Sequence, residues 1–284
     1  MSAALRQRIE EEFAKALKDP ALGVIPGFGK ADAYGHEAGM PIERWVKDFL
    51  AGIDWNNQEV YIYFPNEFLH AIFSIIGKEE KRIWSVLQNT WWGPMLASKK
   101  QVSDFMAGKP IKRWQQEGAD IVVFYGDNLI ENINDVVLIN AKSHDIARAS
   151  RPPNIMSAQR LLKWFDYLLK KSELAKMLAK MNLWFLGVGY LIENNQAIAR
   201  SVHIKDLLLL DLSKVPQINF DAAIQIQWHV KDMVENEQDR YTFIESLADI
   251  FIERWHTHSS RKEKKYKELV KNIKETVRTA RESA

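Results

Sequence analysis

The chain has 284 residues, a hydrophobic fraction of 46% and a formal net charge of +2, which are ordinary values for a globular protein with a sizeable buried core. Because the net charge is small, nucleic-acid binding would need a local concentration of basic side chains. The sequence has no cysteine, which excludes disulfides and thiol-ligated zinc and fits a reducing cytoplasm. It shows no N-terminal signal segment and no apolar run of the roughly twenty residues that a transmembrane span requires, so we expect no membrane partner.

The first part of the chain is predicted to be mainly helical. Residues 2–18 have the apolar period of an amphipathic helix that packs on the core or on a second copy. Residues 26–39 are rich in glycine and form either a plain connector or a loop over DNA. They lack the G-x-x-x-x-G-K-[ST] pattern, so we expect no nucleotide cofactor. Pro41 suits the first turn of a second helix, IERWVKDFLAGI.

A short strand, VYIYF, and one or two further helices are predicted between Trp55 and Trp92. A loose cluster of basic side chains follows, and it forms either a solvated face or a surface that neutralises phosphates. The members of this basic cluster are Lys99, Lys100, Lys109, Lys112 and Arg113.

Two short apolar runs near the middle of the chain predict a pair of neighbouring strands. Residues 121–125 are β-branched or aromatic on both faces, as in a buried strand, and residues 136–139 repeat this character after a polar turn. Side chains alternate along a strand, so Asn140 and Lys142 share a face. The pair therefore places Asp120 near Asn140 and Lys142. On these residues alone, the alternative is an ordinary surface hairpin with polar ends.

This arrangement resembles the active site of PD-(D/E)xK nucleases, in which an acidic residue is followed, on the next strand, by acid-x-Lys. Asp120 and Lys142 match the first acid and the lysine, whereas Asn140 stands where the family has Asp or Glu. The resemblance implies an Mg²⁺ site formed by Asp120, residue 140 and the Ala141 carbonyl, since Mg²⁺ takes oxygen ligands. Lys142 would orient or deprotonate the attacking water, or stabilise the anionic transition state. Glu43 is either an accessory carboxylate of this site or a surface glutamate at a helix N-terminus.

Three further stretches narrow the resemblance to the HincII-like type II restriction endonucleases. They are SHDIARASRPPNIMSAQRLLKW at 143–164, GHEAGMPIERWVKDFL at 35–50 and INFDAAIQIQWHVKDM at 218–233, in the family order and at similar separations. The family implies a homodimer that cuts both strands of double-stranded DNA at a short palindromic site. The two-fold symmetry of such a dimer matches that of its site.

The loop after Lys142 is the predicted DNA-reading element, because it carries arginines, which can donate two hydrogen bonds to guanine. The resemblance implies base contacts from residues 149–154, with Asn154 the best-matched member. The alternative role of Asn154 is the N-cap of a helix that begins at Ile155. The polar face of a strand predicted at 223–230 either reads bases, which the family match favours, or faces solvent. The predicted contacts are Lys100, Arg148, Ala149, Ser150, Arg151, Asn154, Asn219 and Gln225.

The C-terminal half adds strands and a helical tail. Residues 184–190 and 197–204 predict strands, and the apolar run 207–212 predicts a buried strand or a short helix. Residues 239–284 predict helices. The basic end of this tail is either an exposed charged face or a contact to phosphate or to a second copy.

The sequence thus predicts one α/β domain over residues 1–284, with a restriction-endonuclease-like central mixed β-sheet flanked by helices. By resemblance it is a type II site-specific deoxyribonuclease of a restriction-modification system, acting with Mg²⁺ in the cytoplasm of a bacterial or archaeal cell. Asn140 brings no negative charge, so metal affinity and cleavage should both fall, and we interpret the chain as an inactivated form with Asp replaced by Asn. The alternatives are a non-catalytic DNA-binding protein on a nuclease scaffold and a structure-specific repair nuclease.

Overall fold

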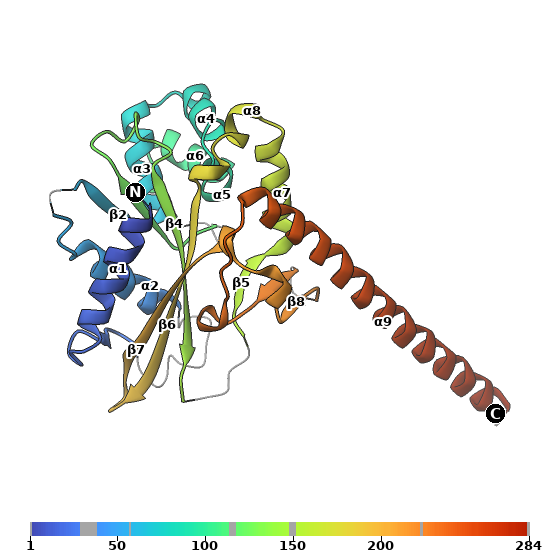
Figure 1. Cartoon of the computed structure of the whole chain (residues 1–284). Coiled ribbons are helices and arrows are strands. Elements are labelled where there is room, and N and C mark those ends of the chain that lie inside the picture. The colour runs from blue at the N-terminus through green and yellow to red at the C-terminus, as the bar shows by residue number, and fades with distance from the viewer. Residues whose placement is uncertain are drawn as a thin grey trace.

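The central element of the fold is a six-stranded mixed sheet with the strand order β1-β7-β6-β4-β3-β2 (Figure 1). Its strands are β1 (Val24–Ile25), β2 (Val60–Tyr63), β3 (Ile121–Tyr125), β4 (Val136–Asp145), β6 (Asn182–Glu193) and β7 (Gln196–Asp206). β4 and β6 are parallel, and the other neighbours are antiparallel. The computed structural model describes residues 2–28, 39–56, 58–113, 118–147, 152–221 and 224–282. The predicted mixed sheet flanked by helices is confirmed.

The strands of this sheet send alternate side chains into two separate cores. Ile121 and Val123 enter one core, whereas Val122 and Phe124 enter the other, and all four are at most 1% exposed. This confirms the prediction of a strand that is buried on both faces. The helices α1 (Ser2–Ala16) and α2 (Gly39–Ala51) cover the first face. The second face is covered by α3 (Pro65–Ile76), α4 (Glu80–Gln88), α5 (Gly93–Leu96), α6 (Lys99–Met106), α7 (Ala158–Leu169), α8 (Ser172–Ala175) and α9 (Arg240–Glu282).

A small antiparallel sheet lies on the second face. Its strands, in the order β5-β9-β8, are β5 (Asn154–Ser157), β9 (Gln225–Gln227) and β8 (Gln217–Asn219). The strand predicted at 223–230 is shorter than expected, because Ile224 has a positive φ of 53° and a 3-10 helix begins at Val230. The alternation itself is confirmed, since Ile226 and Trp228 are buried and the glutamines between and before them are partly exposed. The apolar run at 207–212 forms two short 3-10 helices, Leu207–Leu209 and Leu212–Lys214, rather than a strand.

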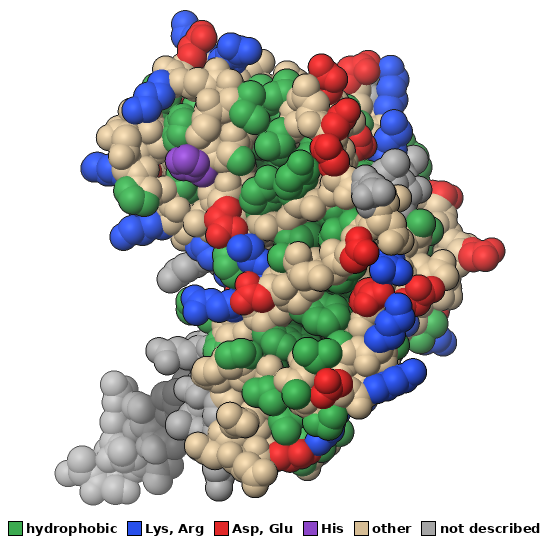
Figure 2. All heavy atoms as spheres, turned by 90° about the vertical axis from the view of Figure 1, so that its left-hand side faces the viewer, with side chains coloured by type: hydrophobic (Ala, Val, Ile, Leu, Met, Phe, Trp, Pro, Cys, Tyr) green, Lys and Arg blue, Asp and Glu red, His purple; other side chains and the backbone are tan. Residues whose placement is uncertain are grey.

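The helical tail is one long helix, α9, which extends far beyond the body of the molecule (Figure 1). Its first turns are anchored in the core by Phe243, Ile244 and Leu247. None of the helices in the described part of the chain is long and apolar enough to cross a membrane. On the face shown in Figure 2, acidic and basic side chains are interspersed, so no single sign of charge dominates there.

Gly187 of β6 lies where the segment after β9 crosses the large sheet. A Cβ atom at this position would come within 2.6 Å of Val230 Cβ. We therefore expect Gly187→Ala to lower the free energy of unfolding by about 1–3 kcal/mol through overpacking, as measured by urea denaturation. Gly52→Ala is the matched control, because its Cβ would meet no atom nearer than 3.5 Å. Equal stability of the two variants would contradict this packing.

Candidate active site

The start of β3 and the middle of β4 bring together the three residues of the predicted catalytic motif. The Asp120 amide donates to the Ile139 carbonyl at 2.8 Å, and Asp120 Oδ2 accepts from the Ala141 amide at 2.8 Å. Lys142 Nζ lies 3.7 Å from the same Asp120 oxygen. Asn140, on the same face of β4 as Lys142, is only 6% exposed. The predicted proximity is confirmed, and the alternative of a surface hairpin is wrong because both strands are interior strands of the sheet.

Asn140 is the buried polar group of this cluster. Its Oδ1 is fully buried and receives no hydrogen bond within the described part of the chain. A buried acceptor without a donor costs free energy, so this atom is suited to a cation or to a donor from a ligand. Together with the Asp120 carboxylate, it supplies the hard oxygen atoms that a divalent cation such as Mg²⁺ prefers. The donor set therefore fits a divalent cation, although its charge is lower than that of two carboxylates.

A second carboxylate, Glu43 of α2, joins the site through Arg113. Arg113 Nη1 lies 2.5 Å from Glu43 Oε2, and Nη2 lies 3.4 Å from Asp120 Oδ1. Burial, and next the charge of Asp120, raise the pKa of Glu43, while Arg113 and Lys142 oppose the shift. The Glu43 side chain is only 15% exposed, so the alternative of a surface glutamate is wrong. No group of three or more His, Asp or Glu side chains suited to a metal was found among the residues that the structure describes.

A hollow of about 590 Å³ connects this cluster to the small sheet and to α7. It is lined by all three motif residues and by two of the predicted DNA contacts, Asn154 and Gln225. Arg160 of α7 also lines it, and burial lowers the pKa of this guanidinium. Sequence reasoning missed Arg160, because an arginine in an amphipathic helix carries no local signal of facing a cavity.

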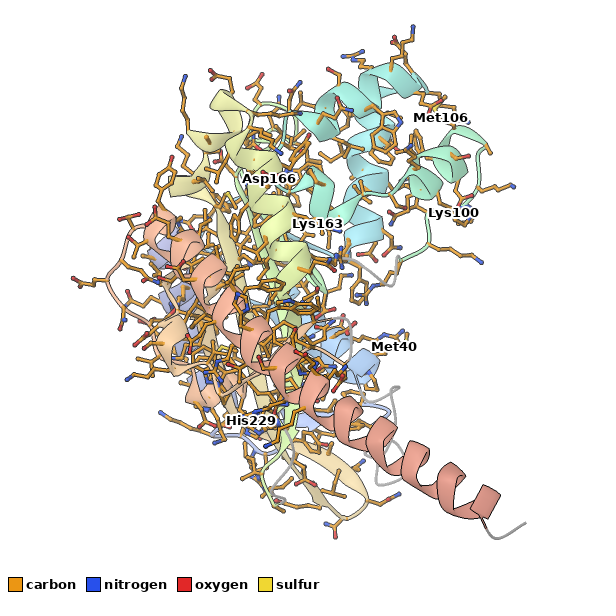
Figure 3. The ribbon with its side chains drawn as sticks, turned by 90° about the vertical axis from the view of Figure 1, so that its right-hand side faces the viewer. Met40, Lys100, Met106, Lys163, Asp166 and His229 are labelled. Carbon is orange, nitrogen blue, oxygen red and sulfur yellow. The ribbon has the colours of Figure 1, made fainter. Side chains whose placement is uncertain are left out.

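The other predicted DNA contacts are not gathered in this hollow. Lys100 lies on α6 (Figure 3) and does not line the hollow; its side chain is 78% exposed and pairs with Asp104 at 2.8 Å. Asn219 pairs with Gln225 across the small sheet, but its Oδ1 accepts from the Asp221 amide at 2.9 Å and it does not line the hollow. The predicted contacts Arg148, Ala149, Ser150 and Arg151 lie outside the described residues.

Asn154 is not the N-cap of the following helix. It belongs to β5, where its Oδ1 accepts from Gln227 Nε2 at 2.9 Å. The helix begins at Ala158 rather than at Ile155, because the preceding residues pair with β9. The cap is Ser157, whose hydroxyl accepts from the Arg160 amide.

We expect Ser157→Ala to lower the free energy of unfolding by about 1 kcal/mol, because it leaves an amide of the first turn of α7 without its acceptor. The Ser157 Oγ to Arg160 N distance is 3.3 Å, and the residue is 7% exposed. Chemical denaturation followed by tryptophan fluorescence measures the change. Ser157→Thr keeps the hydroxyl and should be less affected; an equal loss in both variants would show that packing, not capping, matters here.

Two other hollows, each of about 820 Å³, lie away from these residues. One is lined by Trp55 and Tyr125 at the opposite end of β3, and the other lies between α3 and the segment after α6. Neither contains any member of the predicted catalytic or DNA-binding set. The hollow around Asp120 is therefore the candidate active site.

The mixed sheet and this cluster at its centre define a restriction-endonuclease-like protein. A sequence model of the family described as "Restriction endonuclease HincII" matches residues 27–277, and the chain belongs to this family. It is 24% identical over 203 residues to the type II restriction enzyme HindII of Haemophilus influenzae, covering 70% of this chain and 72% of that protein. The type II restriction enzyme HincII of Haemophilus influenzae matches with the same identity and coverage.

Proposed function

We propose that this chain is a type II restriction endonuclease that hydrolyses phosphodiester bonds of double-stranded DNA with Mg²⁺. The observation that carries the proposal is the single hollow that unites Asp120, Asn140 and Lys142 with Asn154 and Gln225. A cavity lined by both sets can hold a scissile phosphate and the neighbouring bases at the same time. Membership of the HincII family supports the same conclusion.

In the proposed reaction, Asp120, the Asn140 amide oxygen and the Ala141 carbonyl would hold the metal. The chemistry that Mg²⁺ would supply there is a lowered pKa of a bound water and neutralisation of the charge that develops on the phosphate. Lys142 Nζ lies 3.7 Å from Asp120 Oδ2, where it can orient the attacking water or stabilise the anionic transition state. The Ala141 amide holds Asp120 Oδ2 and so orients its carboxylate.

The amide side chains of Asn154 and Gln225 are the proposed base-reading groups within the hollow, since an amide can pair with adenine through two hydrogen bonds. Asn219 and the segment Arg148–Ala149–Ser150–Arg151 would extend this contact. Lys100 lies outside the hollow, so we assign it a phosphate contact, which is independent of sequence. We further propose a homodimer of single-domain chains on a short palindromic site, at work in a bacterial or archaeal cytoplasm.

We also propose that residue 140 makes this chain an inactivated form. Asn140 lowers the charge of the metal site by one unit relative to Asp. The same observation favours a second candidate function, a DNA-binding protein that keeps the nuclease scaffold without cutting. The two differ in whether Asp at position 140 is enough to produce cleavage.

The test is digestion of phage DNA by the present chain and by Asn140→Asp, each with Mg²⁺ and with a chelator. Discrete fragments from the Asp form in Mg²⁺ alone support the restriction endonuclease. If neither form cuts while both bind DNA, the protein is a binding module, and the roles of Asp120 and Lys142 are wrong. Cutting confined to DNA junctions would instead indicate a repair nuclease.

A further inference from the structure

The guanidinium of Arg113 lies between the two carboxylates that flank the candidate active site. It contacts one oxygen of each, Glu43 Oε2 at 2.5 Å and Asp120 Oδ1 at 3.4 Å. Glu43 is 70 residues away along the chain, so this single side chain joins α2 to the start of β3. The function proposed above makes no use of Arg113.

We propose that Arg113 and a divalent cation compete for the oxygens of Glu43 and Asp120, so that Arg113 must move aside when the metal binds. This inference rests on the metal-dependent function proposed above. It adds an arginine that controls how readily the site accepts the ion, and it makes Glu43 an accessory oxygen of that site.

The competition follows from the balance of charge. When ionised, Glu43 and Asp120 carry two negative charges, and Arg113 and Lys142 carry two positive charges. Both carboxylate side chains are only 15% exposed, so an excess of positive charge there is poorly screened by solvent. A divalent ion that joined both side-chain cations would create such an excess.

Arg113, rather than Lys142, is the cation that must leave. Lys142 Nζ lies 3.7 Å from Asp120 Oδ2, the oxygen that also accepts from the Ala141 amide. Arg113 instead holds one oxygen on each carboxylate, which are the atoms that a shared ion would need. Asp120 therefore remains oriented by Ala141 and Lys142 after Arg113 has gone.

Arg113 can leave only by moving, because a guanidinium stays protonated in proteins. Its side chain is 34% exposed, so it can turn towards solvent without unpacking either core. The guanidinium carbon also lies 5.6 Å from the centre of the Phe64 ring, a cation–π contact that holds it beside the carboxylates. These contacts hold the arginine beside the carboxylates, so metal binding has to displace it from them.

The test is Mn²⁺ binding in the absence of DNA, measured from the electron paramagnetic resonance signal of free Mn²⁺. Arg113→Ala should bind Mn²⁺ about tenfold more tightly than its parent, a ratio that corresponds to about 1.4 kcal/mol. Both the present chain and its Asn140→Asp form serve as parents. Arg113→Lys keeps the charge but cannot bridge two carboxylates in the same way. Its Mn²⁺ affinity should therefore lie between that of the parent and that of Arg113→Ala.

Lys112→Ala is the matched control, since it removes the same charge from the adjacent exposed residue. It should change Mn²⁺ affinity by less than about twofold, as a screened surface charge does. An unchanged affinity in Arg113→Ala, or an equal gain in Lys112→Ala, overturns the competition while leaving the metal-dependent nuclease intact. If Arg113→Ala does not fold, Arg113→Lys tests the competition instead: tighter Mn²⁺ binding than its parent supports it, and an unchanged affinity overturns it. Mn²⁺ binding by none of the variants would overturn both proposals.

Discussion

Asn140→Asp is expected to raise the rate of DNA cleavage in Mg²⁺ about a thousandfold or more, which corresponds to about 4 kcal/mol of activation free energy. The Asn140 side chain is buried, its Oδ1 receives no hydrogen bond within the described part of the chain, and it lines the same hollow as Asp120. A carboxylate at this position adds one negative charge to the proposed ligand set without changing its size. Single-turnover cleavage of DNA at fixed Mg²⁺ concentration measures the gain.

The double variant Asp120→Asn with Asn140→Asp is the sharpest control, because it has the same total charge as the present chain. If the two positions act as a pair of ligands, the double variant cuts no faster than the present chain. Cleavage by the double variant at the rate of Asn140→Asp would show that Asp120 is not a ligand. Asn140→Ala removes the amide without adding charge and should also be inactive.

Stability gives a readout of the same substitution that does not depend on cleavage. A second carboxylate buried beside Asp120 should lower the free energy of unfolding by about 1–3 kcal/mol without metal, because an unpaired charge is poorly solvated there. Mg²⁺ should recover this loss, since a ligand that binds only the folded state stabilises it. Equal thermal unfolding of both forms, with and without Mg²⁺, would contradict a metal site at position 140.

Asp206→Ala is expected to lower the free energy of unfolding by about 3–5 kcal/mol, because it leaves a buried cation without its partner. Asp206 Oδ2 lies 3.4 Å from Arg240 Nη2, and the two side chains are only 7% and 15% exposed. Its Oδ1 also accepts from the Leu208 amide at 2.9 Å. Arg240 starts α9, so the pair ties the long helix to the end of β7.

Asp166→Ala is the control for this prediction. Asp166 makes a shorter ion pair, 2.6 Å from Lys170 Nζ, but the two side chains are 62% and 72% exposed. Its removal should change the free energy of unfolding by less than about 1 kcal/mol. Similar losses for the two variants in urea denaturation would show that burial does not decide the strength of these pairs.

Asp206 should also make stability depend on pH. Burial raises its pKa above the ordinary value of 3.8 and outweighs Arg240 and the Leu208 amide, which lower it. The folded state therefore binds the proton more tightly than the unfolded chain, and this contribution is lost as the pH rises through the raised pKa. Relative to Asp206→Asn, which does not titrate, the parent chain should lose stability as the pH rises from the ordinary value of 3.8 through the raised pKa of Asp206. A difference that is independent of pH would refute the raised pKa.

The sequence was most informative about features that a local pattern of residues is sufficient to specify. The run at 121–125 is apolar at every position, so a strand buried on both faces was predictable from composition and period. Asp120, Asn140 and Lys142 were predictable as neighbours, because an antiparallel pair places the start of one strand beside the end of the next. Boundaries were harder: α7 begins at Ala158, since pairing of β5 with β9 overrides a helical pattern that starts earlier.

By itself, the amino-acid sequence determined the central strand that is buried on both faces, the motif of Asp120, Asn140 and Lys142 and, through its resemblance, the family. Those features depend on spacing along the chain, which a sequence records directly. Only the tertiary structure decided that Glu43 and Arg113 belong to the site and that Asn154 and Gln225 line the same hollow. These contacts join residues distant in the chain, such as Arg113 and Glu43, 70 positions apart, and no local pattern encodes which buried surfaces will meet. The packing of α2 and the small sheet against the central strands is what brings these distant residues together.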